Sequence, residues 1–259
     1  MVKPIIIQLV ADYGNGDPAY AEVVQKLTFL DRHIRVNKVN VPRFSTIATG
    51  LWIYQLATVN AHSGLIIYSN TAPRIESAEN TYKEKYGHFA YAELDNGVEV
   101  MAVHVGYAFS LIAPIIKSFH LINVPNTGSQ FRSRDYYPDA VVGIARGKAE
   151  FIGEEIPKES IPDWPVNRIG FVDGYGNMKT TLRQSQFRVT EGSRIRITVN
   201  SKTLTGIVGG ETYHVKDGEV SFAPGSTGGD DRFMEIWVRG ESAWEEFGQP
   251  KVESEFEVK

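Results

Sequence analysis

The chain has 259 residues, of which 42% are hydrophobic and 22% are charged, a composition typical of a globular protein with a substantial core. Its formal net charge of -4 gives no electrostatic reason to expect nucleic acid or an anionic membrane as a partner. Cysteine is absent, which excludes disulfides, thiolate metal sites and a cysteine nucleophile. The six histidines show no HxxxH or HxH spacing, so no metal site is expected.

Apolar runs are short throughout the sequence. None approaches the roughly 20 residues that span a bilayer. The isoleucines that follow Pro4 end at Gln8, which is too short for the core of a signal peptide, about 7–15 residues. We therefore expect a cytoplasmic protein that does not enter the membrane.

The first 150 residues alternate between strand and helix patterns. Residues 5–11 form a β-branched apolar run that predicts a buried strand, and Asp17 with Pro18 marks the start of a helix that reaches Leu30. Further elements are expected as helices at 45–57 and from 138 onward, and as strands at 64–69 and 98–104. This alternation predicts an α/β N-terminal domain, 1–150, with a mostly parallel sheet.

The remainder of the chain changes character. Residues 151–165 contain three prolines without a clear period and are expected to be a linker. Beyond it, in 166–259, short strands separated by Gly and Asp turns predict an all-β barrel or sandwich domain. The strands are expected at 168–172, 194–199, 204–208, 219–223 and 233–238, and a short helix at 242–247.

Three segments carry polar groups that suit a ligand. Asp12 follows the first strand, where ligands of parallel sheets bind, and its carboxylate can accept two hydrogen bonds from a ribose diol. Residues 131–135 place two arginines, a serine and an aspartate before a helix, and residues 173–177 read Asp-Gly-Tyr-Gly-Asn. Each segment also has a plain structural explanation, as a helix cap, a solvated loop or a tight turn.

Taken in order, these segments resemble the S-adenosyl-L-methionine hydroxide adenosyltransferases and the related fluorinases and chlorinases. Ala-Asp-Tyr-Gly at 11–14 is similar to the family's Thr-Asp-Phe-Gly opening. Phe-Arg-Ser-Arg-Asp at 131–135 resembles the segment written His-Gly-Arg-Asp in hydrolases and Tyr-Ser-Arg-Glu in fluorinases. Asp-Gly-Tyr-Gly-Asn at 173–177 is similar to Asp-x-Phe-Gly-Asn, and 233–243 resembles the closing strand and its Gly-Ser-Ala turn.

The resemblance implies a C-terminal β-barrel that completes the site of a neighbouring subunit in a homotrimer, a small-molecule adenosyl substrate, and no metal or cofactor. In the family's chemistry a nucleophile attacks C5′ of the ribose and methionine leaves as a thioether. The implied roles by position are ribose binding for Asp12, ammonium binding for Asp173, adenine pairing for Asn177, a wall of the base pocket for Tyr175, and contact with the nucleophile for Ser133.

Four positions depart from the family's pattern. Asn70 stands where hydrolases have an aspartate, Arg132 stands in the place of their histidine, and Arg74 is the candidate for their arginine. Neither an amide nor a guanidinium can act as a base at neutral pH. Arg232 is the remaining candidate for binding the methionine carboxylate.

Three functions remain open from the sequence. The first is hydrolysis of S-adenosyl-L-methionine to adenosine and methionine. The second is the same fold with a halide, another nucleophile or another adenosyl substrate, which a cationic loop favours. The third is a nucleoside-binding trimer with weak or no catalysis, which the loss of the usual aspartate and histidine favours.

Overall fold

A computed structural model describes residues 4–71, 88–125, 131–210 and 215–259. The chain divides into two compact units, residues 1–163 and 164–259. In the first unit the strands are β1 (Ile5–Ala11), β2 (Ile34–Asn40), β3 (Leu65–Asn70), β4 (Phe89–Leu94), β5 (Glu99–Val103), β6 (Ile116–Ile122) and β7 (Ile152–Glu155). Its helices are α1 (Pro18–Leu30), α2 (Thr46–Thr58), α4 (Arg132–Asp135) and α5 (Tyr137–Ala145), with short 3-10 turns at Ala113–Ile115, Ala149–Phe151 and Lys158–Ser160.

Local capping explains where the two long helices begin. The Asp17 carboxylate accepts a hydrogen bond from the Ala19 N–H at 2.8 Å, and Pro18 occupies the first turn of α1. The Ser45 hydroxyl accepts from the Ala48 N–H at 3.0 Å at the start of α2. Both starts were predicted from the sequence, and the structure confirms them.

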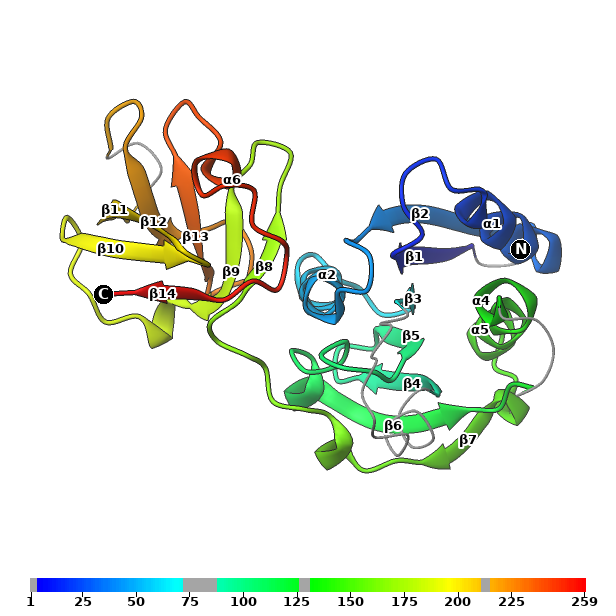
Figure 1. The fold of residues 1–259 in the computed structure, drawn as a ribbon. Coiled ribbons are helices and arrows are strands. Elements are labelled where there is room, and N and C mark those ends of the chain that lie inside the picture. The colour runs from blue at the N-terminus through cyan, green and yellow to red at the C-terminus, as the bar shows by residue number, and fades with distance from the viewer. Residues whose placement is uncertain (1–3, 72–87, 126–130, 211–214) are drawn as a thin grey trace, which may run out of the picture. The chain divides into compact units, whose positions relative to one another are not determined.

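The first unit is a seven-stranded sheet in the order β2-β1-β3-β5-β4-β6-β7. In Figure 1, α2 lies on one face of this sheet, and α1 with α4 and α5 lies on the other. Side chains of β1 alternate between these faces, with Ile7 and Leu9 in the core that also contains Val23 of α1 and Val141 of α5. All but the last residue of β3 are buried, as expected for a central strand covered on both faces.

The prediction of a mostly parallel sheet in an α/β domain is wrong. The pairs β1–β2, β1–β3 and β3–β5 are parallel, but β4–β5, β4–β6 and β6–β7 are antiparallel, so the sheet is mixed and the fold is mostly β. The physical reason lies in the connections. Residues 95–98 join β4 to β5 by a tight turn, whereas a parallel pair needs a crossover of a dozen or more residues.

The segment 151–165 contributes a strand to this sheet. Within it, β7 pairs antiparallel with β6 at the sheet edge, and the division between the units follows Asp163. Among the described residues no helix is long and apolar enough to cross a membrane.

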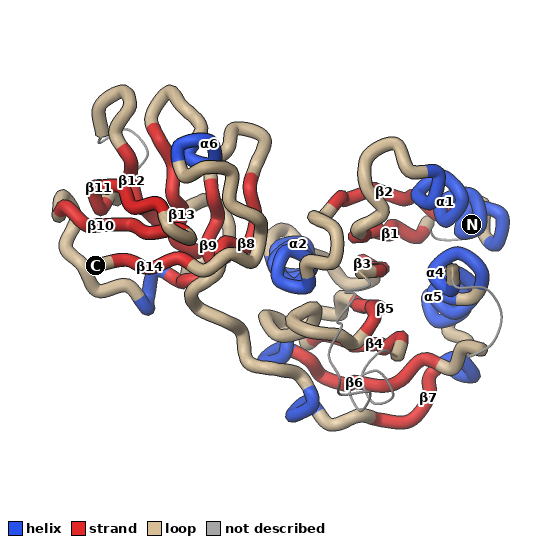
Figure 2. The backbone as a smooth tube through the Cα atoms, in the orientation of Figure 1, coloured by secondary structure: helices blue, strands red, loops and turns tan. Residues whose placement is uncertain are grey.

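The second unit is nearly all strand and turn (Figure 2). Its strands are β8 (Ile169–Val172), β9 (Met178–Arg183), β10 (Arg194–Val199), β11 (Lys202–Val208), β12 (Val220–Pro224), β13 (Phe233–Val238) and β14 (Phe256–Val258), with α6 (Ala243–Glu246) and a 3-10 turn at Gln184–Gln186. They form one mixed sheet in the order β14-β10-β11-β12-β13-β9-β8, in which β11 and β12 are parallel. A bridge between Arg168 and Glu255 links the two edges of this sheet.

Candidate functional site

The first unit has a point at which its strand order reverses. The chain passes from β1 to β2 on one side and then crosses to β3 on the other side, and α1, which follows β1, and α2, which follows β2, lie on opposite faces of the sheet (Figure 1). Such a reversal opens a crevice at the carboxyl ends of the parallel strands, which is where open α/β sheets bind ligands. Asn70 is the last residue of β3 and Asp12 follows β1, and the Asp12 N–H donates to the Asn70 carbonyl at 3.3 Å.

Asp12 is held by the loop that precedes α2. The Phe44 N–H donates to Asp12 Oδ2 at 2.9 Å. Phe44 has a φ of 65° and a side chain that is 42% exposed. A bulky residue in the left-handed region costs on the order of 1–3 kcal/mol, and such strain gathers at functional sites. The strained, exposed aromatic beside a carboxylate is a feature that sequence reasoning missed.

Further contacts join the loop after β1 to the last residue of β2 and to the loop that follows it. The amide of Asn40 donates to the side-chain oxygen of Asn15. Gly14, with a φ of 89°, lies beneath the guanidinium of Arg43, whose nearest nitrogen is 3.7 Å from the position that a Cβ would occupy. The two loops therefore form one wall beside Asp12.

Buried tyrosines bring α4 to this crevice. The Tyr68 hydroxyl donates to the backbone carbonyl of Ser133 at 2.6 Å, and the Ser133 side chain is buried. The Tyr13 ring packs edge-on against Tyr20 and Phe131 at centroid distances of 5.0 and 5.9 Å. These contacts place Ser133 next to Tyr13, the residue that follows Asp12.

The same two tyrosines stay protonated and do not act as bases. Burial raises the pKa of Tyr13 and of Tyr68 above the usual value of a phenol. Both phenols are consequently neutral near pH 7. In the described part of the chain the neutral Tyr13 hydroxyl has no partner with hydrogen-bonding geometry.

Arg132 provides a half-buried cation on α4. Its guanidinium lies 5.4 Å from the centroid of the Tyr137 ring, and that ring stacks on Phe89 at 4.0 Å. The Arg132 Nε is buried and finds no acceptor among the described residues. Arg74, the other cation expected at the site, lies outside the described residues.

The Asp-Gly-Tyr-Gly-Asn segment forms the turn between β8 and β9. Asp173 Oδ1 accepts from the N–H groups of Tyr175 and Asn177 at 2.9 and 3.0 Å, and Asp173 Oδ2 accepts from the Asn177 amide at 3.1 Å. Gly176 has a φ of 81°, and a Cβ there would overlap the hydroxyl of Ser242. The Asp173 carboxylate thus builds the turn that presents Tyr175 and Asn177.

An open hollow of about 780 Å³ lies beside this turn in the second unit. Its lining includes Tyr175, Asn177 and Ser242, together with the acidic side chains of Glu241, Glu245 and Glu246. The Tyr175 side chain is 83% exposed, which leaves its ring available at the edge of the hollow. The size suits a nucleoside-sized ligand.

Arg232 lies away from this turn. Its carbonyl accepts from the Gln184 N–H at 2.7 Å, just beyond the end of β9, whereas Asn177 precedes the start of β9. The length of β9 therefore separates Arg232 from the turn within the second unit, about 20 Å at the usual rise of a strand. Arg232 and Asp173, which the resemblance assigns to the carboxylate and the ammonium of methionine, therefore lie at opposite ends of β9 within this unit.

The structure thus groups the expected site residues by unit. The carboxyl ends of β1 and β3 in the first unit carry Asp12 and Asn70, and α4 with Arg132 and Ser133 packs beside them. One turn of the second unit carries Asp173, Tyr175 and Asn177. Among the described residues no group of three or more His, Asp or Glu side chains is arranged to hold a metal.

No protein-family model and no curated protein matches this chain. Two solved structures have the same fold. An uncharacterized conserved protein from Thermotoga maritima superposes with a TM-score of 0.78 at 16% identity, covering 98% of this chain and 100% of that one. A conserved hypothetical protein from Thermus thermophilus superposes with a TM-score of 0.71 at 19% identity, covering 100% of both chains. At these identities the likeness establishes the fold alone.

Proposed function

We propose that this protein hydrolyses S-adenosyl-L-methionine to adenosine and methionine, as the resemblance of its motifs implies. The observation that carries the proposal is the position of Asp12 at the reversal of strand order, where a carboxylate can accept hydrogen bonds from both hydroxyls of a ribose. The exposed Phe44 ring beside it offers an apolar surface to a nucleoside. The homotrimer and the cytoplasmic location that we expect belong to the same proposal.

In the proposed reaction a water oxygen forms a bond to C5′ while the C5′–S bond breaks. The electron pair of that bond leaves with sulfur, which becomes the neutral thioether of methionine, and the proton lost by water passes to solvent. The sulfonium is a good leaving group, so the protein needs only to orient and desolvate the nucleophile.

The residues of the first unit suit this task without a conventional base. The Ser133 hydroxyl can orient the water, and Arg132 can stabilise its developing hydroxide character. Asn70 can hold the water or the ribose through its amide, but it cannot remove a proton. We therefore expect slow turnover that rises with pH as hydroxide becomes available.

One observation favours a second candidate nucleophile. Within the described residues the buried Arg132 Nε has no acceptor, and an unmet buried donor on a cation is suited to an anion. In this alternative a halide or phosphate replaces water, and the product is a 5′-substituted adenosine.

The test is to incubate the purified protein with S-adenosyl-L-methionine in chloride-free buffer and to analyse the products by mass spectrometry, with and without chloride, fluoride or phosphate. Adenosine and methionine in the bare buffer would support hydrolysis. A 5′-substituted product formed only with an anion would establish the alternative. Binding of adenosine without any product would leave a nucleoside-binding protein and refute both reactions.

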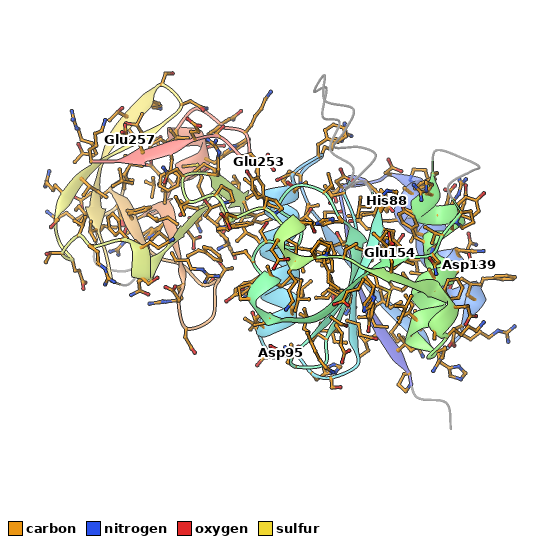
Figure 3. All side chains as sticks on the ribbon, turned by 90° about the horizontal axis from the view of Figure 1, so that it is seen from below. His88, Asp95, Asp139, Glu154, Glu253 and Glu257 are labelled. Atoms are coloured by element: carbon orange, nitrogen blue, oxygen red, sulfur yellow. The ribbon has the colours of Figure 1, made fainter. Side chains whose placement is uncertain are left out.

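Substitution of Asp12 tests the placement of the site. Asp12→Asn keeps the shape but removes the charge, and a lost hydrogen bond to a charged group, about 1.5–3 kcal/mol, corresponds to a fall of roughly 10–150-fold in kcat/KM. Asp95→Asn is the matched control. Asp95 is exposed in the turn after β4, and Figure 3 shows it at the opposite end of that strand from His88. Equal kcat/KM in the two variants would rule out this site.

A further inference from the structure

A largely buried group of three charges lies next to the turn between β8 and β9. The Lys179 Nζ is 3.1 Å from Glu235 Oε1 and 4.0 Å from Asp173 Oδ2. The side chains of Lys179, Glu235 and Asp173 are only 13%, 10% and 22% exposed. Charges that are so poorly solvated persist when each has an opposite charge nearby.

The sheet fixes where this lysine lies. Glu235 of β13 and Lys179 of β9 are directly opposite in the antiparallel pair, so their side chains share one face. Met178 contributes to the core of the second unit, and the alternation of a strand places Lys179 on the other face. Lys179 follows Asn177 by two residues, so its ammonium reaches back to the carboxylate that builds the turn.

Glu235 is itself confined. One of its carboxylate oxygens fills the space that a side chain at Gly225 would occupy, because a Cβ at that glycine would overlap Glu235 Oε2. The other oxygen accepts the hydrogen bond from Lys179 at 3.1 Å. A fixed carboxylate therefore holds the ammonium, and the ammonium faces Asp173.

We propose that Lys179 is a positioning residue for nucleoside binding, an inference that rests on the proposed function, in which Asn177 pairs with the adenine edge. Both oxygens of Asp173 direct the turn, one through two backbone N–H groups and the other through the Asn177 amide. Without the ammonium, the carboxylates of Asp173 and Glu235 repel each other, and Asp173 turns toward solvent. The Asn177 amide then loses the contact that sets its direction.

The experiment measures the Kd of adenosine by titration calorimetry and the KM and kcat for S-adenosyl-L-methionine. The expected result for Lys179→Met is a Kd and a KM raised about tenfold, with kcat within about twofold, because the residues that face the nucleophile lie in the first unit. Lys179→Arg keeps the positive charge and is expected to restore most of the affinity. Lys202→Met, which changes an exposed lysine of β11, is the matched control and is expected to leave Kd unchanged.

The KM-against-kcat split distinguishes positioning from a loss of folded protein, which would lower apparent kcat and leave KM alone. An unchanged Kd in folded Lys179→Met would overturn the inference. Where that variant does not fold, Lys179→Gln, which removes the charge but keeps an N–H donor for Glu235, is measured in its place, and an unchanged Kd in it would overturn the inference equally. Failure of the wild-type protein to bind adenosine at all would instead overturn the proposed function.

Discussion

The buried histidine after β5 makes the stability of the first unit depend on pH. His104 is 4% exposed, and its ring meets those of Phe109 and Phe119 at centroid distances of 5.8 and 5.2 Å. Burial, with a smaller contribution from the nearby His88, lowers the pKa of His104 from 6.5 to about 4. The folded protein therefore holds this imidazole in its neutral form.

The direction of the effect follows from the two pKa values. A lowered pKa means that the unfolded chain binds the proton more tightly than the folded protein does. The stability associated with neutral His104 is fully present above pH 6.5 and is lost as the pH falls toward 4. At about 1.4 kcal/mol for each pH unit, the loss amounts to about 3 kcal/mol.

We expect His104→Gln to remove this pH-dependent loss, whatever its fixed effect on stability. Hydrogen exchange of peptides that cover β5 and β6 measures the opening free energy of the first unit by itself. Between about pH 7.5 and pH 4 the wild-type value should fall by about 3 kcal/mol more than that of the variant. His62→Gln, at an exposed position, is the control and should keep the wild-type slope. Equal slopes in wild type and His104→Gln would refute the reasoning.

Two further predictions concern stability. Gly176→Ala should destabilise the second unit by about 1–3 kcal/mol, because a φ of 81° is strained for alanine and the new Cβ overlaps Ser242. The control is Gly174→Ala, whose Cβ meets no neighbouring atom and whose free energy of unfolding should be nearly that of wild type. Urea denaturation measures both variants. Burial raises the pKa of Glu99 above the value of 4.5 that it has in the unfolded chain. The stability of the fold therefore falls as the pH rises from the unfolded pKa through the higher pKa of the folded protein. Glu99→Gln should therefore be more stable than wild type at pH 7 and lose that advantage near pH 4; lower thermal stability at pH 7 would contradict the argument.

Much of the local structure could be predicted because its causes lie within a few residues. The strand 5–11, the helix start at Asp17 and the strand 233–238 match the structure. The sequence patterns did not predict six strands, namely β2, β4, β6, β7, β9 and β14. For β4 a local signal exists, because the Asn-Gly pair at 96–97 is typical of the hairpin turn that follows this strand. The parallel sheet was inferred from alternation alone, which says nothing about the direction in which strands pair.

The candidate site also has one part that the sequence predicts and other parts that depend on contacts between distant segments. Asp12 was predicted at the end of the first strand, because position after a strand is a local property. The bond from Tyr68 to Ser133 joins residues 65 positions apart, and the strained Phe44 faces Asp12 only after β1 and the loop before α2 have packed together. Nor does any local pattern pair Lys179 with Glu235, which lie 56 positions apart.

The sequence by itself determined the caps, the strand and helix segments and the chemical groups that each loop carries, since these depend on neighbours in the chain. Only the tertiary structure decided the direction of strand pairing, the placement of Ser133 beside the Asp12 loop, and the use of Asp173 to build its own turn. Those features depend on contacts between distant segments, and the burial of apolar side chains on both faces of the sheet selects among them.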